Sequence, residues 1–343
     1  MDLPKLREEL EGDRGIGAHG IVSRTGRVSL NRIPIDITNK ELISTPEIIT
    51  NDIVSVIPAY NDQEGLETTL QSLDRFGLAM IVVVDDGSEP PLKIPFDIST
   101  PFKMIRHDKN RGPAAARNTG VSATKSDWIY FTDCGCIHEP DIFLSYKKSR
   151  VAAGSNVSAI VGPVVATSQG RLGTFYTEEE VLNPPYFFPG HLPRDPRGTR
   201  GLRDGAFEDN TLDALWFITC NALVSRAAMD KVGHFDEKTY GTNFGEDTDL
   251  GIRLLSIGRI IWAPYAKIAH DFTESLDVFD ARFKRYGKSI RLVQHKYNTG
   301  VIVVSGMTVD FLYWYPKFTP PLNEDFIDLA ERRFKMQVEG FFS

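Results

Sequence analysis

The stretch Trp128-Ile129-Tyr130-Phe131-Thr132-Asp133-Cys134-Gly135-Cys136 decides the fold that we predict for this chain. The apolar run at its start indicates a short buried strand, which ends abruptly at an acid, Asp133. Ligands of open α/β sheets bind outside the carboxyl ends of the strands, so Asp133 is well placed to meet a ligand hydroxyl or a bound cation. The alternative is structural, because aspartate also caps turns and helices, and a helix is predicted from about Glu139.

Two earlier segments of the chain end in the same way. Residues 53–57 form an apolar run that stops at Pro58, and a helix follows with leucines at helical spacing, Leu66, Leu70 and Leu73. Residues 80–84 form a continuous apolar run typical of a central parallel strand, which ends in the acidic turn Asp85-Asp86-Gly87-Ser88. This strand–helix–strand order predicts a βαβ unit.

The segments that follow continue the alternation. Residues 102–106 predict a short strand, and Gly112-Pro113 begins an alanine-rich helix, because proline suits the first turn of a helix. Beyond the central stretch we expect a helix at 139–153, strands at 158–165, 215–219 and 260–262, and a helix that begins near Gly245. The predicted fold class is α/β, with a mostly parallel, Rossmann-like nucleotide-binding sheet and helices on both faces.

The turns after these strands should lie together, because the carboxyl ends of parallel strands share one edge of the sheet. That edge holds an aromatic ring, several carboxylates and flexible turns, a set of groups that suits a nucleotide. The sequence contains neither G-x-G-x-x-G nor a P-loop. This argues against an ordinary dinucleotide site and against an ATP-phosphate site.

The composition is that of a globular protein with a sizeable core, since 41% of the 343 residues are hydrophobic and 25% are charged. The net charge of −7 gives no support for a nucleic-acid binder, which usually has a basic face. Three cysteines make neither a disulfide framework nor a four-ligand zinc site. No apolar stretch approaches the roughly 20 residues that span a bilayer, so we expect a soluble, cytoplasmic protein without a transmembrane segment.

Short motifs in a fixed order resemble family 2 glycosyltransferases of the GT-A fold, of the soluble, non-processive type. The likeness covers roughly residues 52–292, and the Gln-x-x-Arg-Trp signature of processive members has no match. The motifs are Val56–Asn61 (VIPAYN), Val83–Ser88 (VVDDGS), Asn110–Gly112 (NRG), Ala116–Asn118 (ARN), Phe131–Asp133 (FTD), Cys220–Arg226 (CNALVSR), Gly233–Glu237 (GHFDE) and Gly245–Leu250 (GEDTDL).

The resemblance implies an enzyme that moves one sugar from a nucleoside diphosphate donor, commonly a UDP-sugar, with inversion at the anomeric carbon. It places Ala59 and Tyr60, with Pro58 and Asp62 beside them, at the border of the donor. It also implies that Asp86 takes the uracil or ribose and that Arg117 lies near the nucleotide. In the Glu246–Asp247 pair, Asp247 would be the catalytic base.

The metal site departs from the family pattern. Asp133 matches the first acid of the family's Asp-x-Asp motif, but the second acid falls on Gly135, which has no side-chain ligand. The resemblance implies a divalent cation, Mn²⁺ or Mg²⁺, near the diphosphate, and His270 matches a histidine that helps to hold it. Gly135 puts this cofactor in doubt, so the site is either rebuilt from Asp133, His270 and diphosphate oxygens or replaced by basic residues. The candidates for that replacement are Arg282, Lys284, Arg285 and Lys288.

We divide the chain into an N-terminal extension (1–50), a GT-A domain (51–300) and a C-terminal extension (301–343). Within the domain, residues 51–136 form the nucleotide-sugar half and residues 137–300 the acceptor half, with a long loop at 169–212. That loop is either a charged solvent loop or an acceptor-side lid, whose arginines would meet an anionic group: Arg194, Arg197, Arg200 and Arg203. The C-terminal extension has three open roles, which are to cover the acceptor site, to form a homodimer contact or to touch a membrane surface.

The function predicted is single sugar transfer to a hydroxyl of a small molecule, a saccharide, or a lipid-linked or carrier-bound acceptor. Glu246 and Asp247 are the candidate catalytic residues, and Asp133 and His270 the candidate metal ligands. The alternatives are a nucleotide-sugar-binding protein with impaired catalysis, and a retaining transferase or nucleotidyltransferase of similar fold. The sugar, the acceptor and the pathway are left open by the sequence.

Overall fold

The structure is a computed structural model of the chain, which describes residues 47–94, 96–167, 170–179, 181, 214, 217–271, 275–297, 316, 318 and 320–343. It also gives the backbone course of residues 22–23, 33–36, 212–213, 300–304 and 307–310. The arginines at positions 194–203 lie outside these residues.

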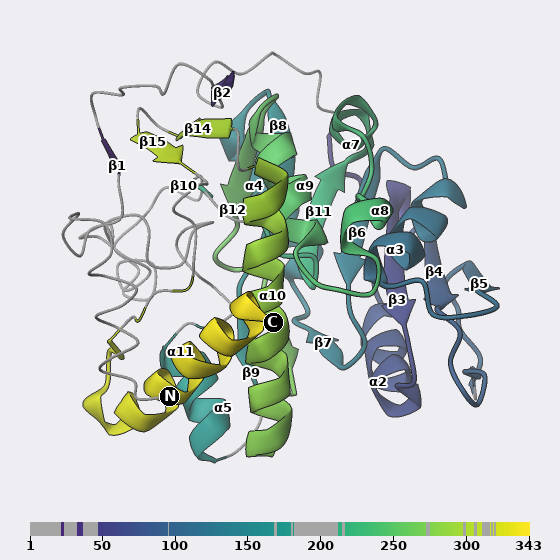
Figure 1. The fold of residues 1–343 in the computed structure, drawn as a ribbon. Coiled ribbons are helices and arrows are strands. Elements are labelled where there is room, and N and C mark those ends of the chain that lie inside the picture. Colours follow the sequence, from purple (N-terminus) through teal and green to yellow (C-terminus); the bar gives the residue numbers. More distant parts are fainter. Residues whose placement is uncertain are drawn as a thin grey trace.

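An eight-stranded sheet forms the centre of the molecule, in the order β10-β12-β8-β11-β6-β3-β4-β5 (Figure 1). The strands β6, β3, β4 and β5 run parallel, and β11 pairs antiparallel with both of its neighbours. The mixed, mostly parallel α/β architecture is therefore confirmed. The strands are β3 (Ile53–Ala59), β4 (Met80–Asp85), β5 (Phe102–Arg106), β6 (Trp128–Thr132), β8 (Val157–Val161), β10 (Leu212–Asp213), β11 (Asn221–Ser225) and β12 (Arg259–Trp262).

Helices cover both faces of this sheet because its central strands are apolar on both sides. Ile53 and Ile57 of β3 face the core that holds the leucines of α2 (Gln63–Leu73), together with α4 (Ile142–Ala153). The alternate residues Val54 and Val56 face the core that holds α3 (Pro113–Ser122), α7 (Arg226–Val232) and α9 (Glu246–Leu255). This period of two on a buried strand is the pattern of a central parallel sheet.

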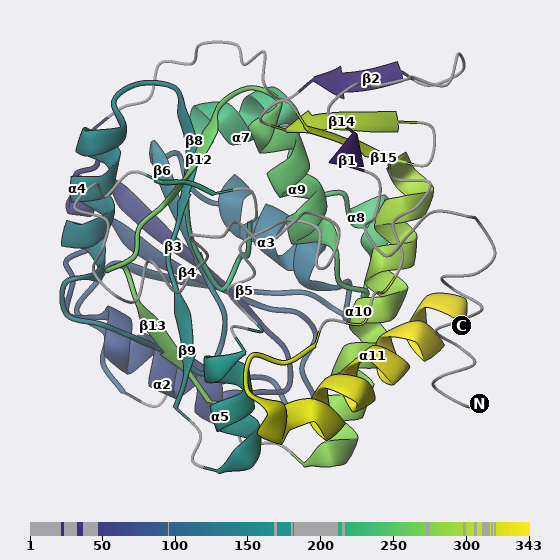
Figure 2. The ribbon, with the colours of Figure 1, turned by 90° about the vertical axis from the view of Figure 1, so that its left-hand side faces the viewer.

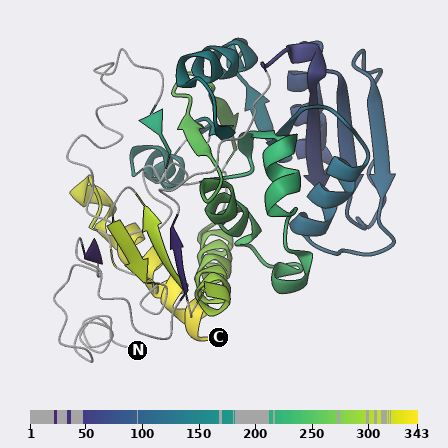
Figure 3. The ribbon, with the colours of Figure 1, turned by 90° about the horizontal axis from the view of Figure 1, so that it is seen from above.

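Two smaller sheets complete the fold. One joins β7 (Cys136–His138), β13 (Ile268–His270) and β9 (Val164–Ala166). The other, which lies apart from the central sheet in Figure 3, joins β1 (Val22–Ser23), β15 (Met307–Asp310), β14 (Gly300–Val304) and β2 (Ile33–Asp36). The predicted N-terminal and C-terminal extensions therefore pair with each other.

Helix α10 (Leu276–Tyr297) is crossed by α11 (Ile327–Phe342), as Figure 2 shows. Glycines allow the close contact, because a Cβ on Gly287 would lie 1.9 Å from the carbonyl oxygen of Gln337, and one on Gly340 equally close to that of Lys284. Among the described residues, no helix is long and apolar enough to cross a membrane. The remaining short helices are η1 (Thr50–Asp52), α5 (Arg171–Glu178), α8 (Glu237–Tyr240) and η3 (Glu324–Phe326).

Three predictions about elements were wrong in detail. Residues 217–219 lie outside any strand, and the strand begins only at Asn221, because an apolar run alone does not fix where sheet pairing starts. The predicted long loop at 169–212 contains α5, whose Phe175 and Tyr176 are buried against α10. The single strand expected at 158–165 is two strands, β8 and β9, which belong to different sheets.

Candidate active site

The predicted donor border lies at the end of β3. Ala59 is buried there, whereas Tyr60 is 49% exposed and available for ring contact with a ligand. Asp62 caps α2 by accepting a hydrogen bond from the Gly65 amide at 2.9 Å. The neighbouring Asn61 donates its backbone N–H to Ser88 Oγ at 2.9 Å, so the turns after β3 and β4 are tied together.

Asp86 has a different setting from the one that the resemblance implied. Its side chain is 3% exposed, and its two oxygens accept hydrogen bonds from the backbone amides of Arg111 and Gly112, at 3.0 and 2.7 Å. His107 Nδ1 contacts the same carboxylate at 2.6 Å. As placed, Asp86 organises the loop that begins α3, and its contact with uracil or ribose remains a prediction. The sequence analysis missed His107 as a partner of Asp86, because it lies in none of the motifs.

Arg117 joins Asp133, after β6, to the start of α9. The guanidinium is 4% exposed and donates through Nη2 to Asp133 Oδ1 at 2.8 Å and through Nη1 to Glu246 Oε1 at 2.6 Å. Burial alone would lower the pKa of Arg117, but the two carboxylates raise it, so the group stays charged. Three predicted site residues from distant parts of the sequence therefore form one ion-pair chain.

Glu246 and Asp247 begin α9 but have different surroundings. Glu246 is 3% exposed, and its second oxygen, Oε2, is buried without a hydrogen-bond partner among the described residues. Burial and the neighbouring Asp247 raise the pKa of Glu246 to about 7, against the opposing effect of Arg117. Asp247 is only half-buried, and its Oδ1 accepts from the Thr248 amide at 2.7 Å. Burial raises the pKa of Asp247 as well.

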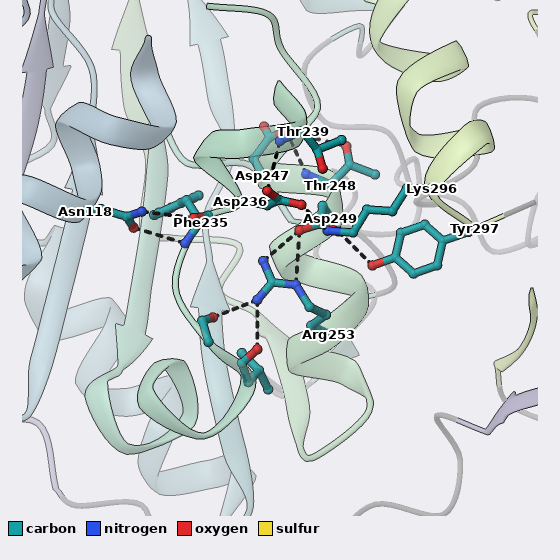
Figure 4. A network of polar contacts seen from close by, with 12 residues as sticks. Asn118, Phe235, Asp236, Thr239, Asp247, Thr248, Asp249, Arg253, Lys296 and Tyr297 are labelled. Atoms are coloured by element: carbon teal, nitrogen blue, oxygen red, sulfur yellow. Dashed lines mark hydrogen bonds and ion pairs between the residues drawn. The ribbon is translucent and has the colours of Figure 1, made fainter. Parts of the chain in front are cut away.

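A second polar network anchors α9 (Figure 4). Asp249 is fully buried and accepts from Tyr297 Oη at 2.7 Å, from Lys296 Nζ at 2.6 Å and from the guanidinium of Arg253. Lys296 also contacts Asp236, which caps α8, at 2.8 Å. The third acid of the GEDTDL motif is therefore a structural anchor between α9 and the end of α10, a role that the sequence analysis missed.

The turn after β6 brings His270 next to Gly135. Because β13 pairs with β7, a Cβ on Gly135 would lie 3.5 Å from His270 Cε1 and 3.8 Å from its Nε2. His270 Nδ1 lies 2.8 Å from the carbonyl of Asp271. A carbonyl only accepts, so Nδ1 is the donor, and this is the kind of hydrogen bond that orients the ring of metal-binding histidines.

The described residues contain no group of three or more His, Cys, Asp or Glu side chains arranged to hold a metal ion. Burial raises the pKa of the Cys136 thiol to about 12, and that of Cys134 is also raised, so neither offers a thiolate. The side chain of Asp133 is 34% exposed, and its role as a metal ligand together with His270 remains a prediction.

Two of the predicted basic residues of α10, Lys284 and Arg285, face different neighbours. Lys284 pairs with Glu339 of α11 at 2.8 Å, so it faces away from the site. Arg285 instead stacks on Phe244, immediately before the GEDTDL motif, with 3.9 Å between the guanidinium carbon and the ring centre.

The parallel strand ends, with Asp133 at one of them and the paired acids of α9 across Arg117, have the architecture of a GT-A type transferase. The family model for glycosyl transferase family 2 matches residues 55–231, which is more than half of the chain. The chain belongs to this family.

Among similar proteins, the pre-mycofactocin glycosyltransferase of Mycobacterium tuberculosis is 30% identical over 262 residues, covering 74% of this chain and 50% of that protein. The succinoglycan biosynthesis protein ExoU of Rhizobium meliloti is 26% identical over 60% of this chain and 58% of its own length. The chain thus spans about half the length of the first of these relatives. A mannosyltransferase from Pyrobaculum calidifontis, solved with GDP-Man and Mn²⁺, is similar with a TM-score of 0.49 and 14% identity, covering 89% of this chain and 77% of that one.

Proposed function

We propose that this chain transfers one sugar from a UDP-sugar to an acceptor hydroxyl with inversion at the anomeric carbon, and that Asp247 is the general base. The acceptor is a small molecule, a saccharide or a carrier-bound molecule. Family membership supports sugar transfer from a nucleotide sugar, and the UDP donor and the inverting course follow from the motifs named above.

The observation that carries the proposal is the state of the Asp247 carboxylate. Its Oδ1 is held by Thr248, whereas no described residue donates a hydrogen bond to its Oδ2. The side chain is half-buried, and burial raises its pKa toward the working range of a general base. An acceptor hydroxyl that donates to Oδ2 would lose its proton to Asp247 as its oxygen attacks the anomeric carbon. In an inverting reaction this base acts on the face opposite the departing diphosphate.

Glu246 has a positioning role in this proposal rather than a chemical one. Its side chain is closed off from an acceptor, and its Oε1 is bound to Arg117 at 2.6 Å. Through Arg117 it holds the start of α9 against Asp133, which fixes the distance between the base and the donor. Enzymes depend on such preorganisation because small displacements of reacting groups are costly.

The cation that the family resemblance implies would be held by Asp133 and His270, which offer it one carboxylate and one imidazole. When bound, such an ion neutralises the charge that develops on the departing diphosphate. Asp133 is oriented by Arg117 through Oδ1, and His270 by its hydrogen bond to the Asp271 carbonyl, the kind of outer partner that metal-binding histidines have.

Two measurements test the proposal. Calorimetric titrations with UDP, GDP and dTDP, each with and without Mn²⁺, should show the tightest binding for UDP and an enhancement by Mn²⁺ that is lost in His270→Ala. Proton NMR of the reaction product should then show the anomeric configuration opposite to that of the donor. A folded protein that binds no nucleotide would exclude the proposed activity, and a product of retained configuration would exclude Asp247 as an inverting base.

A further inference from the structure

Helix α10 turns one of its faces toward the catalytic loop 244–247. Arg282, Arg285, Tyr286 and Ser289 occupy positions i, i+3, i+4 and i+7 of the helix and so share this face. The ring centres of Tyr286 and Phe244 are 5.6 Å apart, and a Cβ on Gly245 would lie 3.4 Å from the Cβ of Ser289. This face therefore packs against the residues that lead into the Glu246–Asp247 pair.

Arg285 is the exposed cation of this face. Its guanidinium lies flat enough over Phe244 to approach the ring centre to 3.9 Å, and the residue is exposed. Within the part of the chain that the structure describes, no carboxylate forms an ion pair with it. Stacking on an aromatic ring orients a guanidinium while its N–H donors stay available for a planar anion.

Two other cations of α10 take part in its contact with α11. Lys284 pairs with Glu339, and Arg291 donates to the carbonyl of Phe341 at 3.1 Å, so both serve the contact with α11. Arg282 interacts with the Tyr286 hydroxyl on the face toward the catalytic loop. Burial and the nearby Arg282 lower the pKa of Arg285, against the opposing effects of Tyr286 and Glu246.

The position of Arg285 relative to the two halves of the site indicates which ligand it meets. The donor-side contacts of the catalytic loop come through Arg117, from α3 and from Asp133 after β6. Helix α10 contacts the same loop at Phe244 and Gly245, by a separate route. Because an inverting base faces the acceptor and not the diphosphate, a cation on this second side is suited to the acceptor.

We infer that Arg285, with Arg282 beside it, binds a negatively charged group of the acceptor, a carboxylate or a phosphate, close to the hydroxyl that Asp247 deprotonates. This inference rests on the proposed function and names the acceptor class for the same site. Guanidinium forks bind carboxylates and phosphates with two parallel hydrogen bonds, which gives orientation as well as affinity. The enzyme therefore prefers anionic acceptors over neutral ones of the same shape.

The test compares matched acceptor pairs with a UDP-sugar donor, glucuronate against glucose and glycerol 3-phosphate against glycerol. The wild-type kcat/KM should favour the charged member of at least one pair by about tenfold or more, and salt should reduce the preference. Arg285→Gln should abolish the preference, and Arg285→Lys should keep part of it. Donor hydrolysis by water and UDP affinity should be unchanged in both variants, and Lys284→Gln, which faces α11 on the same helix, serves as the control.

Three outcomes overturn the inference. The first is equal use of charged and neutral acceptors by the wild type. The second is a charged-acceptor preference that survives Arg285→Gln. The third is weaker UDP binding in Arg285→Gln at an unchanged acceptor ratio, which would assign the residue to the donor diphosphate. A wild-type protein that neither binds UDP nor hydrolyses any donor would instead refute the proposed function, so the two failures are distinguishable.

Discussion

Removal of the Arg117 guanidinium should be the most informative single change to the site. In Arg117→Met, Glu246 keeps its place at 3% exposure but loses its counter-charge. Breaking a buried ion pair in this way costs about 3–5 kcal/mol, whereas the loss of the bond to Asp133, 34% exposed, adds at most about 1 kcal/mol. Against a typical net stability of about 5–15 kcal/mol, this is a large fraction.

The loss of stability in Arg117→Met should depend on pH, and the raised pKa of Glu246 sets the direction of that dependence. Its pKa in the folded protein is raised to about 7, so stability falls as pH rises from the unfolded value toward the folded one. Without Arg117 that pKa rises further, and the extra loss appears only above about pH 7, where wild-type Glu246 is ionised. Urea unfolding followed by circular dichroism should therefore show a larger difference from wild type at about pH 8.5 than at about pH 6.

Two further variants give the control and the refutation. Arg117→Met combined with Glu246→Gln should recover most of the loss and remove its pH dependence, because no buried charge is left unpaired. Arg111→Met, which breaks an exposed pair with Glu237, should cost no more than about 1 kcal/mol. A cost for Arg117→Met below about 1 kcal/mol, or one that is the same at both pH values, would refute this account of the network.

The other predictions concern the supports of the site. Asp249→Asn should lower the free energy of unfolding by about 3–5 kcal/mol, because it leaves Lys296 without its buried partner. It should also reduce turnover because it loosens α9. Thermal unfolding and kcat measure the two effects, and a variant as stable as wild type would contradict the anchoring role. Gly340→Ala should cost about 1–3 kcal/mol, since its Cβ would meet the Lys284 carbonyl at 1.9 Å, whereas Glu339→Ala next to it should leave the unfolding midpoint nearly unchanged. Gly135→Asp should tighten Mn²⁺ binding in the presence of UDP by at least about tenfold, because even the outer partners of metal ligands change metal affinity by about this factor. Gly135→Asn should not tighten it, and equal Mn²⁺ affinities of the two variants by calorimetry would place the cation elsewhere.

The sequence predicted the elements of the nucleotide-sugar half because local patterns decide them. The apolar runs that became β3, β4 and β6 carry enough apolar side chains for both faces of a sheet, and the leucines of α2 repeat at helical spacing. The second half was harder to predict. The run at 215–219 resembles a strand, but the sheet pairs from Asn221, whose buried amide meets Tyr130 and Tyr146.

Contacts between distant residues account for what the sequence analysis missed. The motifs named Arg117, Asp133 and Glu246 separately, yet only the fold shows that one guanidinium joins the two acids. The approach of His270 to Gly135 depends on the pairing of β7 with β13, two short strands without a clear alternation. The burial of Asp86 behind His107 and two amides likewise depends on a loop that no local pattern positions.

Asp247→Asn measures the central claim most directly. Asparagine keeps the shape and the hydrogen bond from the Thr248 amide but cannot accept a proton, so donor binding should be preserved while the base is lost. We predict that kcat falls about 100- to 10,000-fold and that the Kd for UDP with Mn²⁺ stays within about twofold of wild type. A variant that retains turnover within about tenfold of wild type would show that another group removes the acceptor proton.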